Sequence, residues 1–407
     1  MGSQFLDGRF RLGVGIEDTF VPQEGLGRRA LDEYALTQHY DRWSDDLALA
    51  AEAGATSIRY GLPWHLVNPE PGRFVWDWAD RVVDRMSELG LEVIFDLVHY
   101  GTPLWLDNQF VNRSYPDRIA DYAAALATRY GDRITAWTPL NEPQWTARRS
   151  GEMGVWPPEL TGHDGYLQVM LAIGRGICRS QQAIVEASPV EPSFVHVEAS
   201  FRYPRLEGEQ SIERDLLDER RFLALDLVTG RVDDAHPLAA YLASRGVTDA
   251  DLAWFAENRV SPDVIGVNYY PMWSTFEYRG ESGTERDDGV AGLDDVLRTY
   301  AARYDRPVMV TETSYEGTMP ERAAWLADSL DTIRRLRSEI DVVGYIWWPF
   351  FDQIKWQYRE GTAPVIDFLH PLGLVDLVPD EIGVLHRRPN ALFGDFQSFA
   401  LAERGRQ

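Results

Sequence analysis

Residues 78–98 read WADRVVDRMSELGLEVIFDLV, and this stretch contains one complete unit of the fold. Apolar residues recur at three- and four-residue spacing from Trp78 to Leu89, which predicts an amphipathic helix. Gly90 is expected to end that helix. The short apolar run from Glu92 to Val98 predicts a buried strand. A helix followed directly by a buried strand is the repeating unit of a parallel α/β sheet.

The same alternation continues along the 407 residues of the chain. The eight predicted strands are approximately Phe10 to Gly15, Thr56 to Tyr60, Glu92 to Val98, Ile134 to Leu140, Ser193 to Val197, Asp263 to Asn268, Pro307 to Thr311 and Val343 to Trp347. Eight strands with intervening helices, and no linker rich in Pro, Gly or Ser, predict a single (β/α)8 TIM barrel. Its active site is expected at the C-terminal ends of the strands.

The remaining helices and the insertions are also predicted from the pattern. The further helices are Asp41 to Ala53, Asp117 to Tyr130, Gly165 to Ala187 and Arg322 to Ser338. Gly54 and Gly131 are expected to end two of them, as Gly90 does. Charged helical material at about 202–258 and a Gly- and Asp-rich loop at 280–292 are interpreted as rim insertions. We therefore expect one catalytic barrel domain over 1–407.

Composition narrows the classes of partner and location. Lys and Arg number 40 against 64 Asp and Glu, a net charge of −24, which disfavours binding to nucleic acid or to anionic membranes. The only cysteine, Cys178, excludes an internal disulfide and is expected to be a core residue. The N-terminus has no basic segment followed by an apolar stretch, so a cytoplasmic protein is expected. The longest apolar stretch, 342–351, is about half the length of a spanning helix and predicts a buried strand.

Two short segments indicate the chemistry. Thr138-Pro-Leu-Asn-Glu142-Pro follows the fourth predicted strand, and Val310-Thr-Glu312-Thr follows the seventh. A barrel would bring both glutamates to the same mouth. Hydrolysis of an acetal needs one carboxyl group to protonate the leaving oxygen and a second at the oxocarbenium-like carbon. The pair therefore predicts a glycosidase, with a structural ion pair as the alternative.

Over nearly its whole length the chain resembles the family 1 glycoside hydrolases, which are β-glucosidase-like retaining enzymes built on a (β/α)8 barrel. Residues 138–143 resemble the Thr-x-Asn-Glu-Pro motif of that family, and 311–313 resemble its Thr-Glu-Asn/Thr motif. The resemblance implies that Glu142 is the general acid/base and Glu312 the nucleophile. Retention by double displacement requires the two carboxyl groups to lie about 5 to 5.5 Å apart.

The resemblance implies three residues that support catalysis. Arg59 matches the arginine that pairs with the nucleophile, although an arginine bridging two strands is the alternative. Asn141 matches the contact to the sugar 2-hydroxyl, or else it caps a turn. Tyr270 matches the tyrosine that donates to the nucleophile, whereas Tyr269 is expected to be packed under the site.

Other positions match substrate contacts of the family. His99 matches a histidine that binds a sugar hydroxyl, with Tyr100 where tryptophan is usual. Asn268 matches the family residue two positions before that tyrosine and is a candidate substrate-binding residue. Trp348 matches the tryptophan on which the sugar ring stacks, whereas its neighbour Trp347 is expected in the interior.

The sugar-binding segments depart from the family pattern. Lys355, followed by Trp356, occupies the place of the glutamate that holds the 4- and 6-hydroxyls. The first strand lacks the usual glutamine, for which Glu17 or Asp18 is the candidate replacement. Lys355 indicates either an anionic sugar, such as a 6-phosphoglycoside or glucuronide, or a neutral or smaller sugar with Lys355 paired to Asp352, Glu17 or Asp18.

The sequence thus predicts an exo-β-glycosidase acting on small or oligomeric β-glycosides. Transglycosylation through the same intermediate and a non-catalytic carbohydrate-binding barrel are the alternatives. Neither a metal ion nor an organic cofactor is expected, because the reaction is proton and carboxylate chemistry. The sequence does not indicate an oligomeric state.

Overall fold

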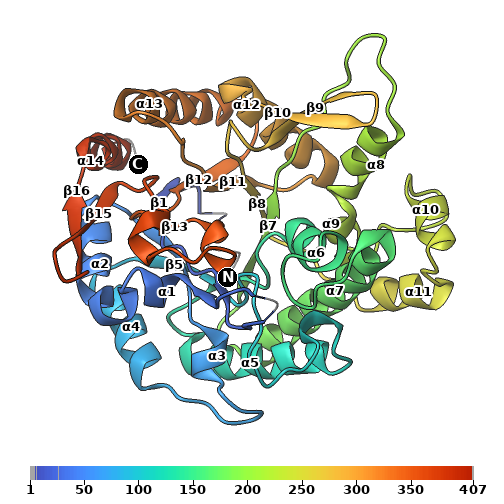
Figure 1. The fold of residues 1–407 in the computed structure, drawn as a ribbon, viewed down its shortest axis with the longest axis horizontal. Helices are drawn as coiled ribbons and strands as arrows, with labels where there is room; N and C mark the ends of the chain where they lie inside the picture. Colours follow the sequence, from blue (N-terminus) through green and yellow to red (C-terminus); the bar gives the residue numbers. More distant parts are fainter. Residues whose placement is uncertain (1–4, 6, 26, 406–407) are drawn as a thin grey trace.

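Eight parallel strands close into a barrel at the centre of the molecule (Figure 1). The structure is a computed structural model that describes residues 5, 7–25 and 27–405. Around the barrel the strands are β1 (Arg11–Gly15), β4 (Ser57–Gly61), β5 (Glu92–Asp96), β6 (Ala136–Thr138), β7 (Ser193–Ala199), β8 (Val264–Asn268), β11 (Val308–Glu312) and β12 (Val342–Trp347), and β12 pairs with β1. Each corresponds to a predicted strand, so the (β/α)8 fold is confirmed.

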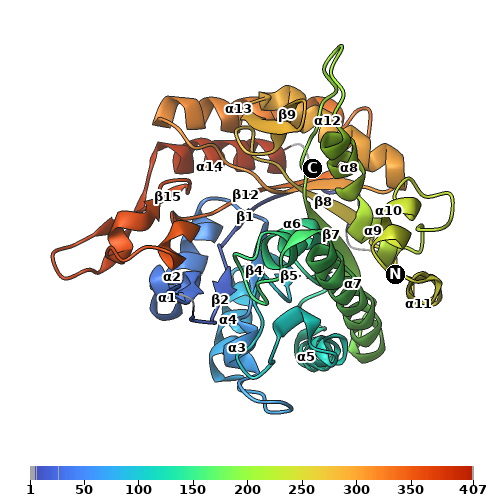
Figure 2. The same cartoon turned by 45° about the vertical axis from the view of Figure 1, so that its right-hand side comes forward.

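Helices form the outer layer around the barrel (Figures 1 and 2). The predicted helices correspond to α2 (His39–Glu52), α4 (Asp77–Glu88), α5 (Tyr115–Tyr130), α7 (Gly162–Ala187) and α13 (Met319–Leu336), and the C-terminal part adds α12 (Gly289–Tyr304) and α14 (Ala391–Arg404). α13 begins earlier than expected because Thr318 and Glu321 form a capping box.

Shorter elements lie between these. They are β2 (Phe20–Val21), β3 (Leu31–Asp32), α1 (Glu33–Leu36), α3 (Trp64–Val67), α6 (Pro143–Ala147), β13 (Gln353–Ile354), β14 (Leu369–His370), β15 (Val375–Pro379), β16 (Leu385–Pro389), the π-helix η3 (Arg148–Glu152) and the 3-10 helices η2 (Gln109–Val111), η4 (Trp356–Arg359) and η5 (Val365–Phe368).

The barrel strands are almost completely buried because they are covered on both faces. All seven residues of β7 are buried, and so are all six of β12, which begins the longest apolar stretch of the sequence. That stretch is therefore a buried strand, as predicted. Within the part of the chain that the structure describes, no helix combines the length and apolarity needed to cross a membrane.

Two of the three helix-ending glycines behave as expected. Gly54 (φ +86°) and Gly90 (φ +69°) adopt the left-handed conformation after α2 and α4. Gly131 differs, because its φ is −65° and it is not in the left-handed region. A Cβ atom there would lie 2.4 Å from the Ala127 carbonyl oxygen and 2.8 Å from Ser188 Oγ. Close approach, and not backbone conformation, requires this glycine.

The predicted insertions contain regular structure. Residues 202–258 hold α8 (Ile212–Arg220), α9 (Leu223–Val228), α10 (Ala239–Ser244) and α11 (Asp249–Glu257). Residues 280–292 are not a loop, since β9 (Thr275–Arg279) and β10 (Ser282–Arg286) form a hairpin there before α12 begins. The Glu281 carboxylate accepts hydrogen bonds from the backbone N–H groups of Ile212 and Glu213, which ties the hairpin to α8.

Candidate active site

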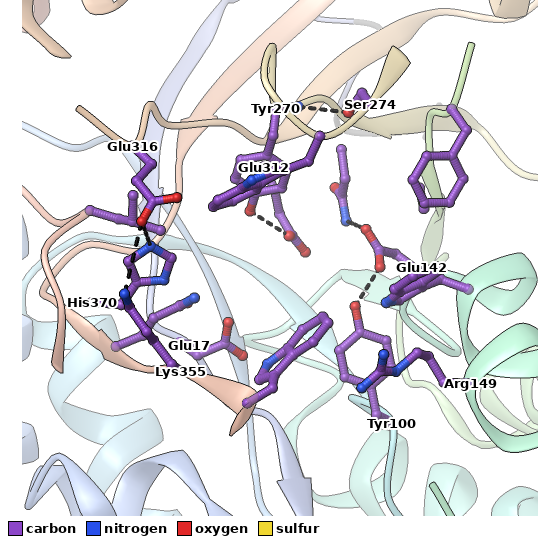
Figure 3. A pocket seen from close by; sticks show the side chains of 18 of the residues that line it. Glu17, Tyr100, Glu142, Arg149, Tyr270, Ser274, Glu312, Glu316, Lys355 and His370 are labelled. Carbon is purple, nitrogen blue, oxygen red and sulfur yellow. Dashed lines mark hydrogen bonds and ion pairs between the residues drawn. The ribbon is translucent and has the colours of Figure 1, made fainter. Parts of the chain in front are cut away.

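A cavity of about 570 Å³ opens at the C-terminal ends of the barrel strands (Figure 3). The predicted site residues that line it are Glu17, His99, Glu142, Asn268, Tyr270, Glu312, Lys355 and Trp356. Asp18, Arg59, Asn141 and Trp348 are buried beside or beneath these residues. The barrel thus brings together side chains that are up to 339 residues apart in the sequence, from Glu17 to Trp356.

Glu312, at the end of β11, is held by a fixed charge and a hydroxyl group. Arg59 Nη1 lies 2.5 Å from Glu312 Oε1, and Tyr270 Oη donates to Glu312 Oε2 at 2.9 Å. The Arg59 guanidinium is fully buried and also pairs with Asp96 at 2.7 Å. A carboxylate between a guanidinium and a hydroxyl donor is favoured in its ionised form. This environment suits a nucleophile.

Glu142 lies across the same cavity and has neutral hydrogen-bond donors (Figure 3). Asn268 Nδ2 donates to its Oε1 at 2.8 Å, and the Tyr100 hydroxyl donates to its Oε2. The Glu142 backbone has a φ of +48°, a strained conformation for a residue with a side chain. Its N–H bonds the Val197 carbonyl at 3.1 Å, which holds this turn against β7.

Burial changes the acidity of both carboxyl groups. It raises the pKa of Glu312 to about 8; the Arg59 guanidinium opposes this effect and the Glu142 carboxylate adds to it. Burial also raises the pKa of Glu142, against the hydrogen bonds from Tyr100 and Asn268. Two buried acids that repel each other favour sharing one proton near neutral pH. Because only Glu312 contacts a guanidinium directly, the proton is favoured on Glu142.

Asn141 links the two glutamates from behind the cavity surface. Its Oδ1 accepts from Arg59 Nη2 at 2.6 Å and from Asn268 Nδ2 at 3.3 Å. These two donors orient the amide so that its Nδ2 points at His99 Nε2, 2.9 Å away. The side chain is completely buried, so it positions its neighbours in this structure. The expected contact with a sugar 2-hydroxyl stays a prediction.

His99 lies between Asn141 and a pair of acidic residues. Its Nδ1 is 2.7 Å from Asp18 Oδ1, and its Nε2 is 3.6 Å from Glu17 Oε1. Burial lowers the pKa of His99, but the Asp18, Asp96 and Glu17 carboxylates outweigh that effect and raise it well above its usual value. Nδ1 therefore keeps its proton near neutral pH.

The two candidate replacements for the missing glutamine have different surroundings. Glu17 lines the cavity and accepts from the Thr19 N–H and hydroxyl and from Trp348 Nε1. Asp18 instead pairs with His99 and does not line this cavity. Glu17, Asp18 and His99 offer ligand atoms within 4.8 Å of one another, as a metal site would. Their mutual contacts and the donors on Glu17 account for this proximity without a metal ion.

Trp348 is not where the sequence places it. It is 1% exposed and is absent from the residues that line the cavity. The His99 ring stacks on it with centroids 5.5 Å apart, and the Arg59 guanidinium lies 4.7 Å from its ring centroid. Its ring is therefore covered by protein, and the expected sugar-stacking face is not available. Trp347 is in the interior, as expected, and Trp356 is the tryptophan of this segment that lines the cavity.

Lys355 has a partner that the sequence did not suggest. Its Nζ lies 3.9 Å from Glu316 Oε1, and His370 Nε2 lies 3.1 Å from the same oxygen. Asp352, one of the expected partners, accepts hydrogen bonds from the backbone N–H groups of Gly373 and Leu377. The Lys355 side chain is 40% exposed, so its ion pair with Glu316 is partly solvated. The pair lies at one end of the cavity (Figure 3).

Sequence reasoning missed several polar cavity residues, among them Tyr100, Arg149 and Glu316. Tyr100 was noticed only as a replacement for tryptophan, although its hydroxyl contacts Glu142. Its φ of +73° is not visible in the sequence. Glu316 lies in a loop and Arg149 in the π-helix η3, neither within a motif, and their place in the cavity depends on tertiary contacts.

Comparison with known proteins identifies the class. Residues 2–286 match Glycosyl hydrolase family 1, so the chain belongs to this family and is an O-glycoside hydrolase.

The chain has low sequence identity to individual members of the family. The chain is 24% identical over 410 residues to the aryl-phospho-beta-D-glucosidase BglC of Bacillus subtilis (strain 168), covering 84% of each protein. It is 26% identical over 400 residues to a beta-glucosidase of Agrobacterium sp. (strain ATCC 21400), covering 87% of this chain and 84% of the relative. A beta-glucosidase from Thermotoga maritima in complex with azafagomine has the same fold, with a TM-score of 0.80, 18% identity and 98% and 99% of the two chains covered.

Proposed function

We propose that this family 1 glycosidase is a retaining exo-β-glycosidase that hydrolyses small β-glycosides through a covalent glycosyl-enzyme. Glu312 is the nucleophile and Glu142 the general acid/base. The observation that carries the proposal is the asymmetry of the two carboxyl groups in one cavity. Glu312 contacts the Arg59 guanidinium, whereas Glu142 accepts hydrogen bonds only from uncharged donors among the described residues.

The first step forms the glycosyl-enzyme. A Glu312 oxygen attacks the anomeric carbon while the bond between that carbon and the leaving oxygen breaks, and Glu142 gives its proton to that oxygen. The aglycone departs as a neutral alcohol. Arg59 and Tyr270 keep the Glu312 carboxylate oriented before the attack.

The second step releases the sugar. Ionised Glu142 takes a proton from water, the water oxygen bonds to the anomeric carbon, and Glu312 leaves as a carboxylate. Two inversions restore the original β-configuration. Tyr100 and Asn268 stabilise Glu142 in its ionised form during this step, because both donate hydrogen bonds to its oxygens. An alcohol in place of water would give transglycosylation.

Trapping of the intermediate tests this proposal. A 2,4-dinitrophenyl 2-deoxy-2-fluoro-β-glycoside should label the enzyme, and peptide mapping should locate the adduct on Glu312. Glu312→Gln is the matched control and should not be labelled. A panel of aryl β-glycosides that differ at C4, C5 and C6 would identify the sugar. If NMR shows the α-anomer as the first product of a β-glycoside, the retaining mechanism is wrong.

A further inference from the structure

Arg149, from the π-helix η3, lines the same cavity as Glu142. Its guanidinium lies among three indole rings, with ring centroids 5.5 Å away for Trp145, 4.9 Å for Trp156 and 5.6 Å for Trp356. Figure 3 shows Arg149 beside Tyr100 and Glu142, away from Lys355. The cavity therefore has two cationic ends with different surroundings.

The charge of Arg149 is not balanced by a direct partner. Among the described residues none forms an ion pair with it, and its Nε is buried without a hydrogen-bond partner. The neighbouring Arg148 pairs with Glu152 at 3.1 Å, and Lys355 pairs with Glu316. Among the charged groups, the Glu360 carboxylate has the largest effect on the pKa of Arg149, which it raises, but Glu360 is exposed and its ion pair is with Arg28.

A guanidinium in such surroundings can accept an anionic partner. Burial lowers the pKa of Arg149 to about 10, so the group remains charged at neutral pH. Removing a charge from water without pairing it is unfavourable, and a guanidinium pairs best with the planar oxygens of a carboxylate or with a phosphate. The three indole rings restrict its position, and the residue lines the cavity.

We propose that Arg149, within the Trp145–Trp156–Trp356 cage, binds an anionic group of the substrate, a carboxylate or a phosphate. This inference rests on the proposed function and adds the substrate class. Arg149, and not Lys355, is then the residue that recognises the anion, because the Lys355 ammonium group already pairs with the Glu316 carboxylate. Tyr100 packs against both Trp156 and Trp356 and bonds Glu142, so the cage adjoins the acid/base. The anion belongs either to the sugar or to the leaving group.

Matched substrate pairs distinguish these two sources. For the leaving group, the pair is 4-carboxyphenyl and 4-carbamoylphenyl β-glucoside. For the sugar, 4-nitrophenyl 6-phospho-β-glucoside and β-glucuronide are each compared with 4-nitrophenyl β-glucoside. In either the leaving-group comparison or the sugar comparison, Arg149→Gln should lower the ratio of kcat/KM for the anionic substrate to kcat/KM for the neutral one at least about tenfold. Arg148→Gln, a neighbour with its own partner, should leave both ratios unchanged.

The contrary outcomes are equally specific. Unchanged ratios for Arg149→Gln in both comparisons would overturn the inference, and so would a wild-type enzyme that cleaves neutral glucosides but no anionic substrate. Failure to cleave any substrate would instead reject the proposed function. In that case, quenching of tryptophan fluorescence by benzoate or inorganic phosphate tests anion binding at Arg149 independently of catalysis. Saturable quenching that Arg149→Gln abolishes supports it, and equal quenching in both proteins overturns it.

Discussion

The floor of the cavity and its side walls differ in how their polar groups are satisfied. The floor consists of Arg59, Asn141, Glu142, Asn268 and Glu312, which are at most 6% exposed and hydrogen-bond to one another. The walls carry Arg149 without an ion-pair partner among the described residues and Lys355 with a 3.9 Å one. The floor is a closed network suited to one reaction, whereas the walls keep binding capacity for a substrate.

This difference separates chemistry from specificity. A closed buried network fixes geometry, because removing any member leaves its neighbours unsatisfied. Groups on a wall are half-solvated, so a substitution there alters which substrate binds more than how the bond breaks. We therefore expect effects on activity to decrease from the floor to the walls.

The largest effect is expected at the nucleophile. Glu312→Gln keeps the size of the side chain but removes the attacking charge, so kcat should fall at least about 10⁴-fold on every substrate. Glu198→Gln is the matched control, since Glu198 is fully buried on β7 but does not line the cavity. Steady-state kinetics with circular dichroism as a check of folding measures both. A kcat of Glu312→Gln within a factor of ten of the wild-type value would show that Glu312 is not the nucleophile.

The acid/base should give a smaller loss that depends on the leaving group. Glu142→Gln should reduce kcat/KM about 10²- to 10⁴-fold for alkyl glycosides, but far less for 2,4-dinitrophenyl glycosides, which need no proton.

The same variant tests which glutamate holds the shared proton. If the proton is on Glu142, that residue is neutral while Glu312 ionises, so glutamine at position 142 should leave the acidic limb of the pH profile, which reports Glu312, in place. The basic limb, which reports loss of the Glu142 proton, should disappear. An acidic limb that moves to lower pH would show that Glu142 is ionised while Glu312 titrates, because the Glu142 carboxylate raises the pKa of Glu312.

The floor was largely predictable from the sequence because its residues are fixed by strand order. Glu142 follows β6 and Glu312 ends β11, and the barrel places all strand ends at one mouth. Arg59 on β4 and Asn268 on β8 were assigned from the resemblance to the family, and their strands end at the same mouth.

The walls were not predictable for the opposite reason. Trp348 directly follows β12, but whether its ring faces the cavity depends on His99 and Arg59, which cover it. The pairing of Lys355 with Glu316 depends on how two loops approach each other. The unpaired state of Arg149 is likewise a property of tertiary packing, which no local pattern records.

Tyr100 lies at the boundary of the two regions and should show an intermediate effect. Tyr100→Phe removes a hydrogen bond to the Glu142 carboxylate, which should slow the reaction by less than about tenfold. That bond lowers the pKa of Glu142, so its loss should raise the pKa. Because Glu142 must be protonated in the first step, the basic limb of kcat/KM should move to higher pH.

The control for this shift is another buried tyrosine. Tyr122 is fully buried and does not line the cavity. Its hydroxyl donates to the Leu62 carbonyl at 3.0 Å. Tyr122→Phe should leave the pH profile in place even if it lowers stability. Identical profiles for Tyr100→Phe and the wild type would show that Tyr100 only fills space beside Trp156.

The smallest effect is expected at Lys355. Its contact with Glu316 is half-exposed and long, and such pairs contribute about 0 to 1 kcal/mol. Lys355→Gln should therefore change kcat/KM for neutral glucosides by less than about threefold, and for 6-phosphoglucosides by about the same factor. A selective loss above about tenfold on the phosphorylated sugar would contradict this. Lys355 would then leave Glu316 to bind the substrate, and the wall at this end would recognise an anion as Arg149 is proposed to do.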